Sequence, residues 1–210
     1  MANQNSEETD QLLAAVSNGD RSALGKLMQR HLPYLRKVVE VRISRELSSR
    51  IDVSDVVQET QMVVMRRIQE FAMDRPTSFR VWLRSRAIEQ LIDQYRRHVG
   101  AAKRSVRREQ GQDNNSSMAI AHALVTDNPG QRLRRAEIAS RVRELIDDLR
   151  ENDREILALR HGEGLSNNET AETLQISVDT ASKRYGRALR RLVEKVSHAG
   201  LETSLGLDNI

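Results

Sequence analysis

The stretch SNNETAETLQISVDTASKRYGRALRRL, residues Ser166 to Leu192, decides how the C-terminal part of the chain folds. Ser166 is a helix N-cap candidate, and Glu169 three residues later completes the pattern of a capping box. Ser177 is a second N-cap candidate. The pattern therefore predicts a short helix, a tight turn and a longer helix, which together form a helix-turn-helix.

The longer of these two helices has one apolar side and one basic side. Its apolar residues recur at helical spacing: Ala181, Tyr185, Ala188, Leu189 and Leu192. The opposite side carries small or basic residues, namely Ser182, Lys183, Gly186, Arg187 and Arg190. Such a surface suits the major groove of DNA. A plain helical hairpin in a bundle is the alternative, but it would not need so basic an outer face.

Composition favours helices and excludes several classes of site. Of 210 residues, 38% are hydrophobic, 30% are charged and only 3% are aromatic, and the net charge is +4. Without cysteine, the chain has no disulfide, thiol redox centre or Cys-based zinc site. The five histidines show no metal-ligand spacing, so neither a metal nor a cofactor is expected. No long apolar run or signal peptide is present, which predicts a cytoplasmic protein without membrane insertion.

The first part of the chain predicts several short helices. They cover residues 9–16, residues 22–31, and a segment that begins at Pro33 and continues to Ile43, with Asn18-Gly19-Asp20 as a turn. Another helix is expected from the N-cap Ser54 to Phe71. Four of its residues lie off the apolar stripe: Asp55, Gln58, Glu59 and Met62. Because no histidine lies at ligand spacing, this side is a solvated face or a docking face rather than a metal site.

A loop at Asp74–Ser78 leads into a long basic helix, predicted to span Ser78 to Arg108. Trp82 shares a face with Arg86, Asp93 and Arg97. Trp82 is then either a core residue or a platform for unstacked bases. The basic residues that follow are Arg96, Arg97, Lys103, Arg104, Arg107 and Arg108, a density that favours contact with phosphates.

The sequence predicts an all-α protein with two small helical domains joined by a flexible linker. The first domain covers residues 1–108, the polar linker covers 109–131 with a boundary at Thr126–Gly130, and a tail follows at 198–210. The second domain, 132–197, has a helix at 133–150 and a short helix that begins with a capping box at Asn152 and Glu155. The helix-turn-helix completes this domain.

Four motifs in this order resemble a bacterial RNA polymerase sigma factor of the extracytoplasmic-function (ECF) type, in the sigma-70 family. Asn18-Gly19-Asp20 resembles the early turn of the family, and Asp55 to Thr60 (DVVQET) resembles its polymerase-binding helix. Phe79, Trp82-Leu83, Asp93 and Arg96 resemble the segment that reads and melts the minus-ten element. The segment Ser166–Leu192 is similar to the helix-turn-helix that reads the minus-thirty-five element.

The resemblance implies functions for specific residues. Core polymerase is expected to bind Asp55, Gln58, Glu59 and Met62. Minus-ten DNA is expected at Trp82, Arg86, Asp93, Arg96, Arg97, Lys103 and Arg104, and minus-thirty-five DNA at Thr180, Ser182, Lys183, Arg184 and Arg187. Core RNA polymerase and promoter DNA are the implied partners, with an anti-sigma factor or another regulator as a further one. The implied action is not enzymatic.

The recognition helix departs from the family pattern at three positions. Ala181 and Tyr185-Gly186 depart from the family pattern, so a promoter sequence cannot be carried over. The alternative function is a stand-alone helix-turn-helix regulator that binds operator DNA as a dimer. That alternative gives no role to the Asp55–Thr60 face or to Trp82.

Overall fold

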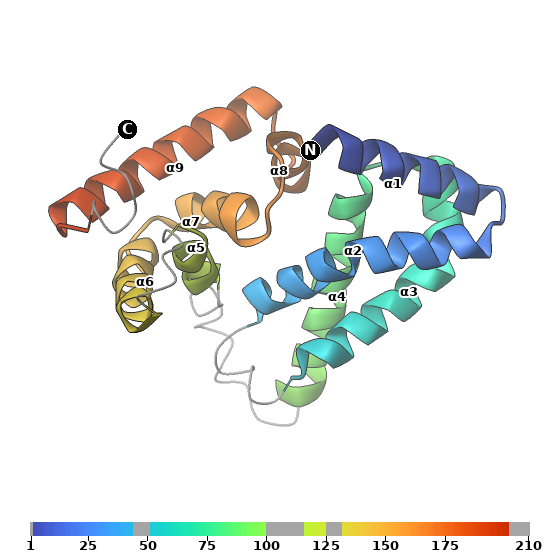
Figure 1. Ribbon diagram of the computed structural model, residues 1–210, viewed down its shortest axis with the longest axis horizontal. Coiled ribbons are helices and arrows are strands. Elements are labelled where there is room, and N and C mark those ends of the chain that lie inside the picture. Colours follow the sequence, from blue (N-terminus) through green and yellow to red (C-terminus); the bar gives the residue numbers. More distant parts are fainter. Residues whose placement is uncertain (1, 44–50, 100–115, 125–131, 202–210) are drawn as a thin grey trace. The chain divides into compact units, whose positions relative to one another are not determined.

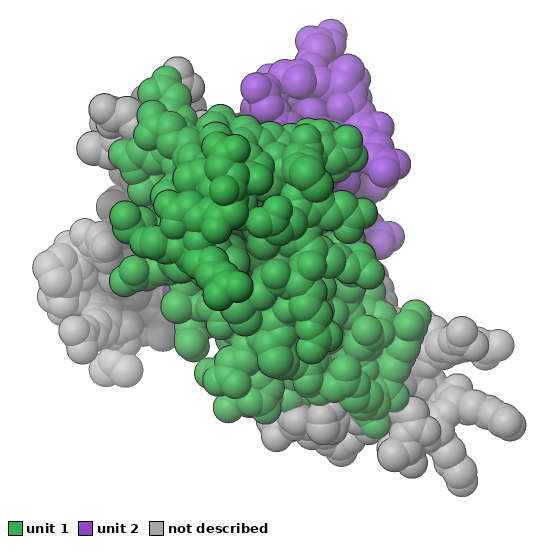
Figure 2. All heavy atoms as spheres, turned by 90° about the vertical axis from the view of Figure 1, so that its right-hand side faces the viewer, with its two compact units in different colours: residues 1–107 green, residues 108–210 purple. Residues whose placement is uncertain are grey.

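The computed structural model describes residues 2–43, 51–99, 116–124 and 132–201, and every regular element in these ranges is a helix. The chain divides into two compact units, Met1–Arg107 and Arg108–Ile210 (Figure 2). Each unit has its own hydrophobic core. The predicted all-α, two-domain fold is therefore confirmed.

The described helices of the first unit pack around one apolar core. They are α1 (Ala2–Ser17), α2 (Arg21–Arg42), α3 (Val53–Asp74) and α4 (Phe79–Val99) (Figure 1). Helices α2, α3 and α4 contact one another, while α1 lies against α2 and α3. Leu27, Val56 and Leu83, from three different helices, have no exposed surface. Burial of such side chains contributes about 1.5–3 kcal/mol each.

Helix α2 differs from the sequence prediction because it runs unbroken through Pro33. The prediction placed one helix end before Pro33 and a new start at it, but the structure has a single helix, Arg21–Arg42. A proline inside a helix costs about 3 kcal/mol or more. Leu27, His31, Leu35 and Val38 continue one buried stripe on both sides of Pro33. Their shared burial offsets the lost hydrogen bond.

The N-cap of α3 also differs from the prediction. Asp52 is the N-cap, and its carboxylate accepts a hydrogen bond of 2.7 Å from the backbone N–H of Ser54. Ser54 therefore lies inside the first turn. Both residue types are good N-caps. The choice follows from Ile51, which is buried in the core and fixes where the chain enters the helix.

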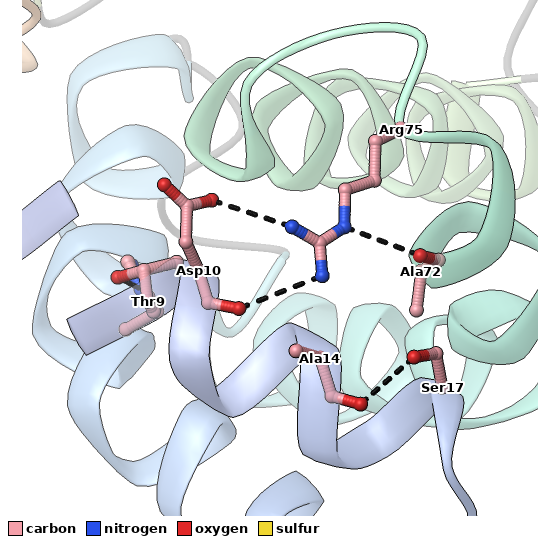
Figure 3. Close-up of polar contacts among 7 residues, drawn as sticks. Thr9, Asp10, Ala14, Ser17, Ala72 and Arg75 are labelled. Carbon is pink, nitrogen blue, oxygen red and sulfur yellow. Dashed lines mark hydrogen bonds and ion pairs between the residues drawn. The ribbon is translucent and has the colours of Figure 1, made fainter. Parts of the chain in front are cut away.

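Arg75 ends α3 and ties it to α1 (Figure 3). Its backbone is left-handed, with φ 43°, and its N–H donates to the carbonyl of Phe71 at 2.8 Å. Its side chain donates to the carbonyls of Ala72 at 3.2 Å and Asp10 at 3.5 Å, and pairs with the Asp10 carboxylate at 3.8 Å. These contacts hold the backbone of a non-glycine residue in the left-handed conformation that glycine usually adopts at a helix end.

The second unit is built around the helix-turn-helix. Its described elements are α5 (Ser116–Leu124), α6 (Arg132–Asp147), α7 (Glu151–Leu157), the π-helix η2 (Ala158–Gly162), α8 (Asn167–Leu174) and α9 (Val178–His198) (Figure 1). Helix α5 lies within the predicted linker 109–131. Its residues Ile120 and Ala121 are fully buried, and α5 contacts α6 and η2. The C-terminal core therefore begins before the predicted boundary at Thr126–Gly130.

Three helix boundaries in this unit differ from the prediction. Helix α6 ends at Asp147 rather than at residue 150. Arg150 precedes α7 without a side-chain cap, so the capping box predicted at Asn152 and Glu155 does not start the helix. Both residues instead lie within the helix. The short helix predicted to end near Leu159 continues as the π-helix η2. Beyond it, Gly164 has a positive φ of 72°.

Candidate protein- and nucleic-acid-binding surfaces

Both caps of the predicted helix-turn-helix are present. The hydroxyl of Ser166 accepts from the N–H of Glu169 at 3.2 Å, and the Glu169 carboxylate accepts from the N–H of Ser166 at 2.7 Å. Ser177 caps α9 by accepting from the N–H of Thr180 at 3.1 Å. The predicted turn and both predicted helix starts are confirmed here.

The turn between α8 and α9 is held by a left-handed residue and a cross-contact. Gln175 has φ 54° and closes α8. The side-chain amide of Asn167 donates to the carbonyl of Val178 at 3.1 Å, which joins the start of α8 to the start of α9. These contacts set the angle at which α9 leaves the turn.

Helix α9 buries one side and exposes the other. Ala181, Ala188 and Leu192 are buried in the unit. The exposed side carries Ser182, Lys183, Gly186, Arg187 and Arg190, while Thr180 and Arg184 are partly buried beside it. This exposed set is called the α9 outer face.

Local contacts hold the charged side chains of the α9 outer face. The Lys183 ammonium pairs with Asp179 at 2.8 Å, and both side chains are about 70% exposed (70% and 71%). Arg187 Nε donates to the carbonyl of Lys183 at 3.3 Å. An exposed ion pair like that of Lys183 is weak, so the ammonium can exchange Asp179 for another anion at little cost.

Tyr185 of α9 contacts two residues of the π-helix η2. Its hydroxyl lies 3.1 Å from Nε2 of His161, and the Arg160 guanidinium lies 5.1 Å from the centre of its ring. Arg160 also donates to the carbonyl of Leu165 at 2.7 Å. No pattern of neighbouring residues predicts this cluster, because His161 and Arg160 lie 24 and 25 residues from Tyr185 in the chain.

A second exposed surface runs along α3. Asp55 and Gln58 are exposed, and Met62 is 47% exposed on the same side of the helix. Met65, 54% exposed, and Met73, 73% exposed, are not among the predicted contacts, and they extend this side along the helix. Exposed methionines adapt to varied partners, and a row of them is typical of a docking surface. We call Asp55, Gln58, Met62, Met65 and Met73 the α3 outer face.

Glu59 is not grouped with the α3 outer face. It is only partly exposed, and its carboxylate is hydrogen-bonded to Gln94 and Arg97 of α4. The structure therefore separates Glu59 from Asp55, Gln58 and Met62, the residues with which the sequence grouped it.

Some aromatic and basic side chains of α4 pack against neighbouring residues, and others are exposed. Trp82 stacks on Phe71 of α3, with ring centres 4.4 Å apart, and remains partly exposed. Arg86 pairs with Glu89 at 2.7 Å, and Arg96 pairs with Asp93 at 3.5 Å. Lys103 and Arg104, and with them Arg107 and Arg108, lie outside the described residues.

No group of three or more His, Asp or Glu side chains that could hold a metal ion occurs in the described ranges. None of the helices in those ranges is both long enough and apolar enough to cross a membrane.

Two family matches cover most of the chain. Residues 27–109 match Sigma-70 region 2, and residues 132–192 match Sigma-70, region 4. The RNA polymerase sigma factor CnrH of Cupriavidus metallidurans is 32% identical over 194 residues, which cover 90% of this chain and 94% of CnrH. The chain belongs to the sigma-70 family of RNA polymerase sigma factors.

Other relatives agree with this assignment. The ECF sigma factor SigD of Mycobacterium tuberculosis is 27% identical over 194 residues, covering 92% of this chain and 86% of SigD. The structure of CnrH in complex with the cytosolic domain of CnrY has a TM-score of 0.54 at 25% identity, covering 91% of this chain and 98% of that one. The sigma factor RpoE of Bartonella quintana, solved with the anti-sigma factor NepR, has a TM-score of 0.50 at 20% identity and shares the fold, covering 82% of this chain and 96% of that one.

The protein is therefore a sigma factor of the ECF type, which binds core RNA polymerase and promoter DNA and directs promoter-specific transcription initiation. The alternative of a stand-alone operator-binding regulator is not favoured. The region 2 match accounts for the N-terminal helices, which that alternative leaves without a role.

Proposed function

We propose that this sigma factor docks on core polymerase through the α3 outer face and reads promoter DNA with α4 and α9. The observation that carries the proposal is the basic outer face of α9, displayed by a helix-turn-helix with both N-caps formed. A helix of this kind enters the major groove and contacts base edges.

For docking, we assign Asp55, Gln58 and Met62 as polymerase contacts. Their side chains project from a helix whose opposite side is buried, so they are available without unfolding the unit. A few exposed methionines beside polar groups give a surface that excludes water on contact while keeping hydrogen bonds at the rim.

For the minus-ten element, we assign Trp82, Arg86, Asp93, Arg96 and Arg97 of α4, together with Lys103 and Arg104, which lie outside the described residues. Trp82 stacks on Phe71 and is partly exposed. One part of its ring is therefore packed against the core, and the exposed part is available to contact an unstacked base. Opened DNA needs such a site, because a base outside the helix loses its stacking partners.

For the minus-thirty-five element, we assign Thr180, Ser182, Lys183, Arg184 and Arg187. Arg187 suits base reading, because its planar fork can grip guanine O6 and N7 together. Lys183 suits phosphate contact, because its ammonium is a flexible point charge.

The action we propose is that of a non-enzymatic initiation factor in the cytoplasm. Two structural relatives were solved with partner proteins, the cytosolic domain of CnrY and the anti-sigma factor NepR. By analogy, we propose that a protein regulator of this kind restrains the present sigma factor by covering the surfaces that polymerase needs.

Run-off transcription tests the proposal. Purified core polymerase is assayed with and without this protein on the upstream region of its own gene. A transcript that depends on the protein and starts at one position is expected. Equal transcription with and without the protein would contradict the proposed function.

A further inference from the structure

Glu59 of α3 directs its carboxylate toward α4. Its Oε1 atom accepts a hydrogen bond from the Gln94 amide at 2.9 Å and another from Arg97 Nη1 at 3.0 Å. Gln94 is 7% exposed, and the side chains of Glu59 and Arg97 are 25% and 59% exposed. The network therefore extends from a buried amide, through a partly covered carboxylate, to an exposed cation.

The environment of Glu59 differs from that of Asp55, one turn earlier on the same helix. Asp55 is exposed, whereas Oε2 of Glu59 is buried and finds no hydrogen-bond donor among the described side chains. A carboxylate that has lost this much contact with solvent depends on its internal donors. Glu59 is thus poorly placed to form a new ion pair with polymerase.

We infer that Glu59 is a positioning residue for Arg97 in promoter opening, rather than a polymerase contact. The inference rests on the proposed function of α4 in contacting minus-ten DNA. A long arginine side chain loses rotamer freedom when it binds a ligand, and a prior hydrogen bond removes part of that loss. Arginine has several N–H donors, so a single bond to Glu59 leaves others for a phosphate or a base edge.

The sign of the expected effect separates positioning from simple electrostatics. If charge alone mattered, removing the negative Glu59 from beside Arg97 would strengthen the attraction to DNA. If Glu59 holds Arg97 in its binding position, the same removal weakens opening. The two accounts therefore predict opposite changes from one substitution.

The test measures the rate of promoter opening, by permanganate reactivity of unpaired thymines, with holoenzyme formed at saturating sigma factor. We expect Glu59→Ala to lower the rate by roughly five-fold or more, a typical size for coupling within a hydrogen-bonded network. Glu59→Gln keeps a hydrogen-bond acceptor and should recover much of the rate. Glu70→Ala removes an exposed carboxylate from the same helix and should leave the rate unchanged.

The pathway through Arg97 is tested by a double-mutant cycle. In an Arg97→Ala background, Glu59→Ala should have no further effect on opening. Thermal unfolding of each variant checks the fold, and Glu59→Gln provides a well-packed variant if Glu59→Ala unfolds.

Three results would overturn the inference. The first is an unchanged or faster opening rate in Glu59→Ala. The second is an effect of equal size in the Arg97→Ala background. The third is a loss of core affinity like that of Asp55→Ala, with normal opening once the polymerase is saturated. A wild-type protein that gives no transcript with core polymerase would contradict the proposed function instead.

Discussion

His31 is a histidine that the first unit keeps uncharged. It is 4% exposed, lies 3.0 Å from the Thr9 hydroxyl through Nε2, and packs edge-on against Phe79 with ring centres 4.8 Å apart. Burial, followed by the positive charges of Arg80 and Arg30, lowers its pKa from 6.5 to about 4. Protonation therefore costs more in the folded unit than in the unfolded chain.

This shift predicts a loss of stability in acid. Between the unfolded pKa of 6.5 and the folded pKa of about 4, the unfolded chain binds a proton that the folded unit does not. The free energy of unfolding therefore falls as the pH drops through this window, by up to about 3 kcal/mol from this residue. Calorimetry at pH 7.5 and pH 5 measures the loss, and His31→Gln should make it smaller. An equal loss in both proteins would show that other groups titrate.

Gly186 is a helical glycine for which the fold has no steric need. A Cβ at this position would meet no atom within 4 Å, and the same is true of Gly25 in α2. Alanine in place of a helical glycine stabilises by about 0.5–1 kcal/mol. Gly186 lies on the α9 outer face, where a missing side chain allows the helix backbone to approach the bases closely.

We therefore predict that Gly186→Ala and Gly25→Ala both raise the free energy of unfolding, and that only Gly186→Ala changes promoter preference. Chemical denaturation gives the first quantity. Holoenzyme binding to a library randomised upstream of the start site gives the second. If Gly186→Ala keeps every wild-type preference, the glycine has no part in sequence reading.

At the scale of single elements, the α3 outer face gives a prediction about docking. Asp55→Ala combined with Met65→Ala should weaken binding to core polymerase, since it removes a rim charge and an apolar contact that is 54% exposed. The expected cost is about 1–3 kcal/mol, because only a minority of interface side chains contribute strongly. Affinity is measured by titration with labelled core. Glu70→Ala on the same helix is the control, and unchanged affinity in the double variant would remove α3 as the docking element.

The caps show how much of an element its own sequence determines. Ser166, Glu169 and Ser177 form the predicted caps. The cap pattern is not sufficient by itself, because Ser54 and Asn152 fit it equally well and lie inside their helices. Pro33 was misread as a helix start because the burial of Leu27 and Leu35 on either side comes from other helices. Likewise, the predicted linker 109–131 includes a brief turn or helix at Met118–Leu124, whereas α5 belongs to the C-terminal core. Its short apolar segment has a structural role only through its contacts with α6 and η2.

The candidate surfaces show the same division between local and distant information. Helical spacing correctly placed Ser182, Lys183 and Arg187 on one exposed side of α9. It also placed Glu59 beside Asp55 on α3. The two residues are one helical turn apart, but Asp55 is exposed and Glu59 contacts α4. The bond from Glu59 to Arg97 spans 38 residues, and no periodicity within either helix could reveal it.

At the scale of the whole molecule, the two units have separate cores, and the boundary between Arg107 and Arg108 coincides closely with the predicted start of the linker at residue 109. The order of four motifs along the chain indicated the correct family, because one motif alone is weak evidence and four in the same order are specific. Promoter recognition then depends on two DNA contacts made by one chain. Linking two weak binding modules raises overall affinity only when both sites can be engaged together.

This dependence gives a prediction about promoter spacing. Either DNA-binding unit alone buries too little surface to bind duplex DNA tightly. We therefore expect core polymerase to hold the two units at a fixed separation. Inserting about five base pairs between the two promoter elements turns one element by roughly half a helical turn relative to the other. Run-off transcription should then fall by about ten-fold or more, because the altered spacing removes one of the two DNA contacts. Arg187→Ala should weaken transcription from the native promoter but have little further effect on the promoter with the insertion, where α9 is already disengaged. If the insertion leaves transcription unchanged, the two units read DNA independently and the fixed-spacing arrangement is wrong.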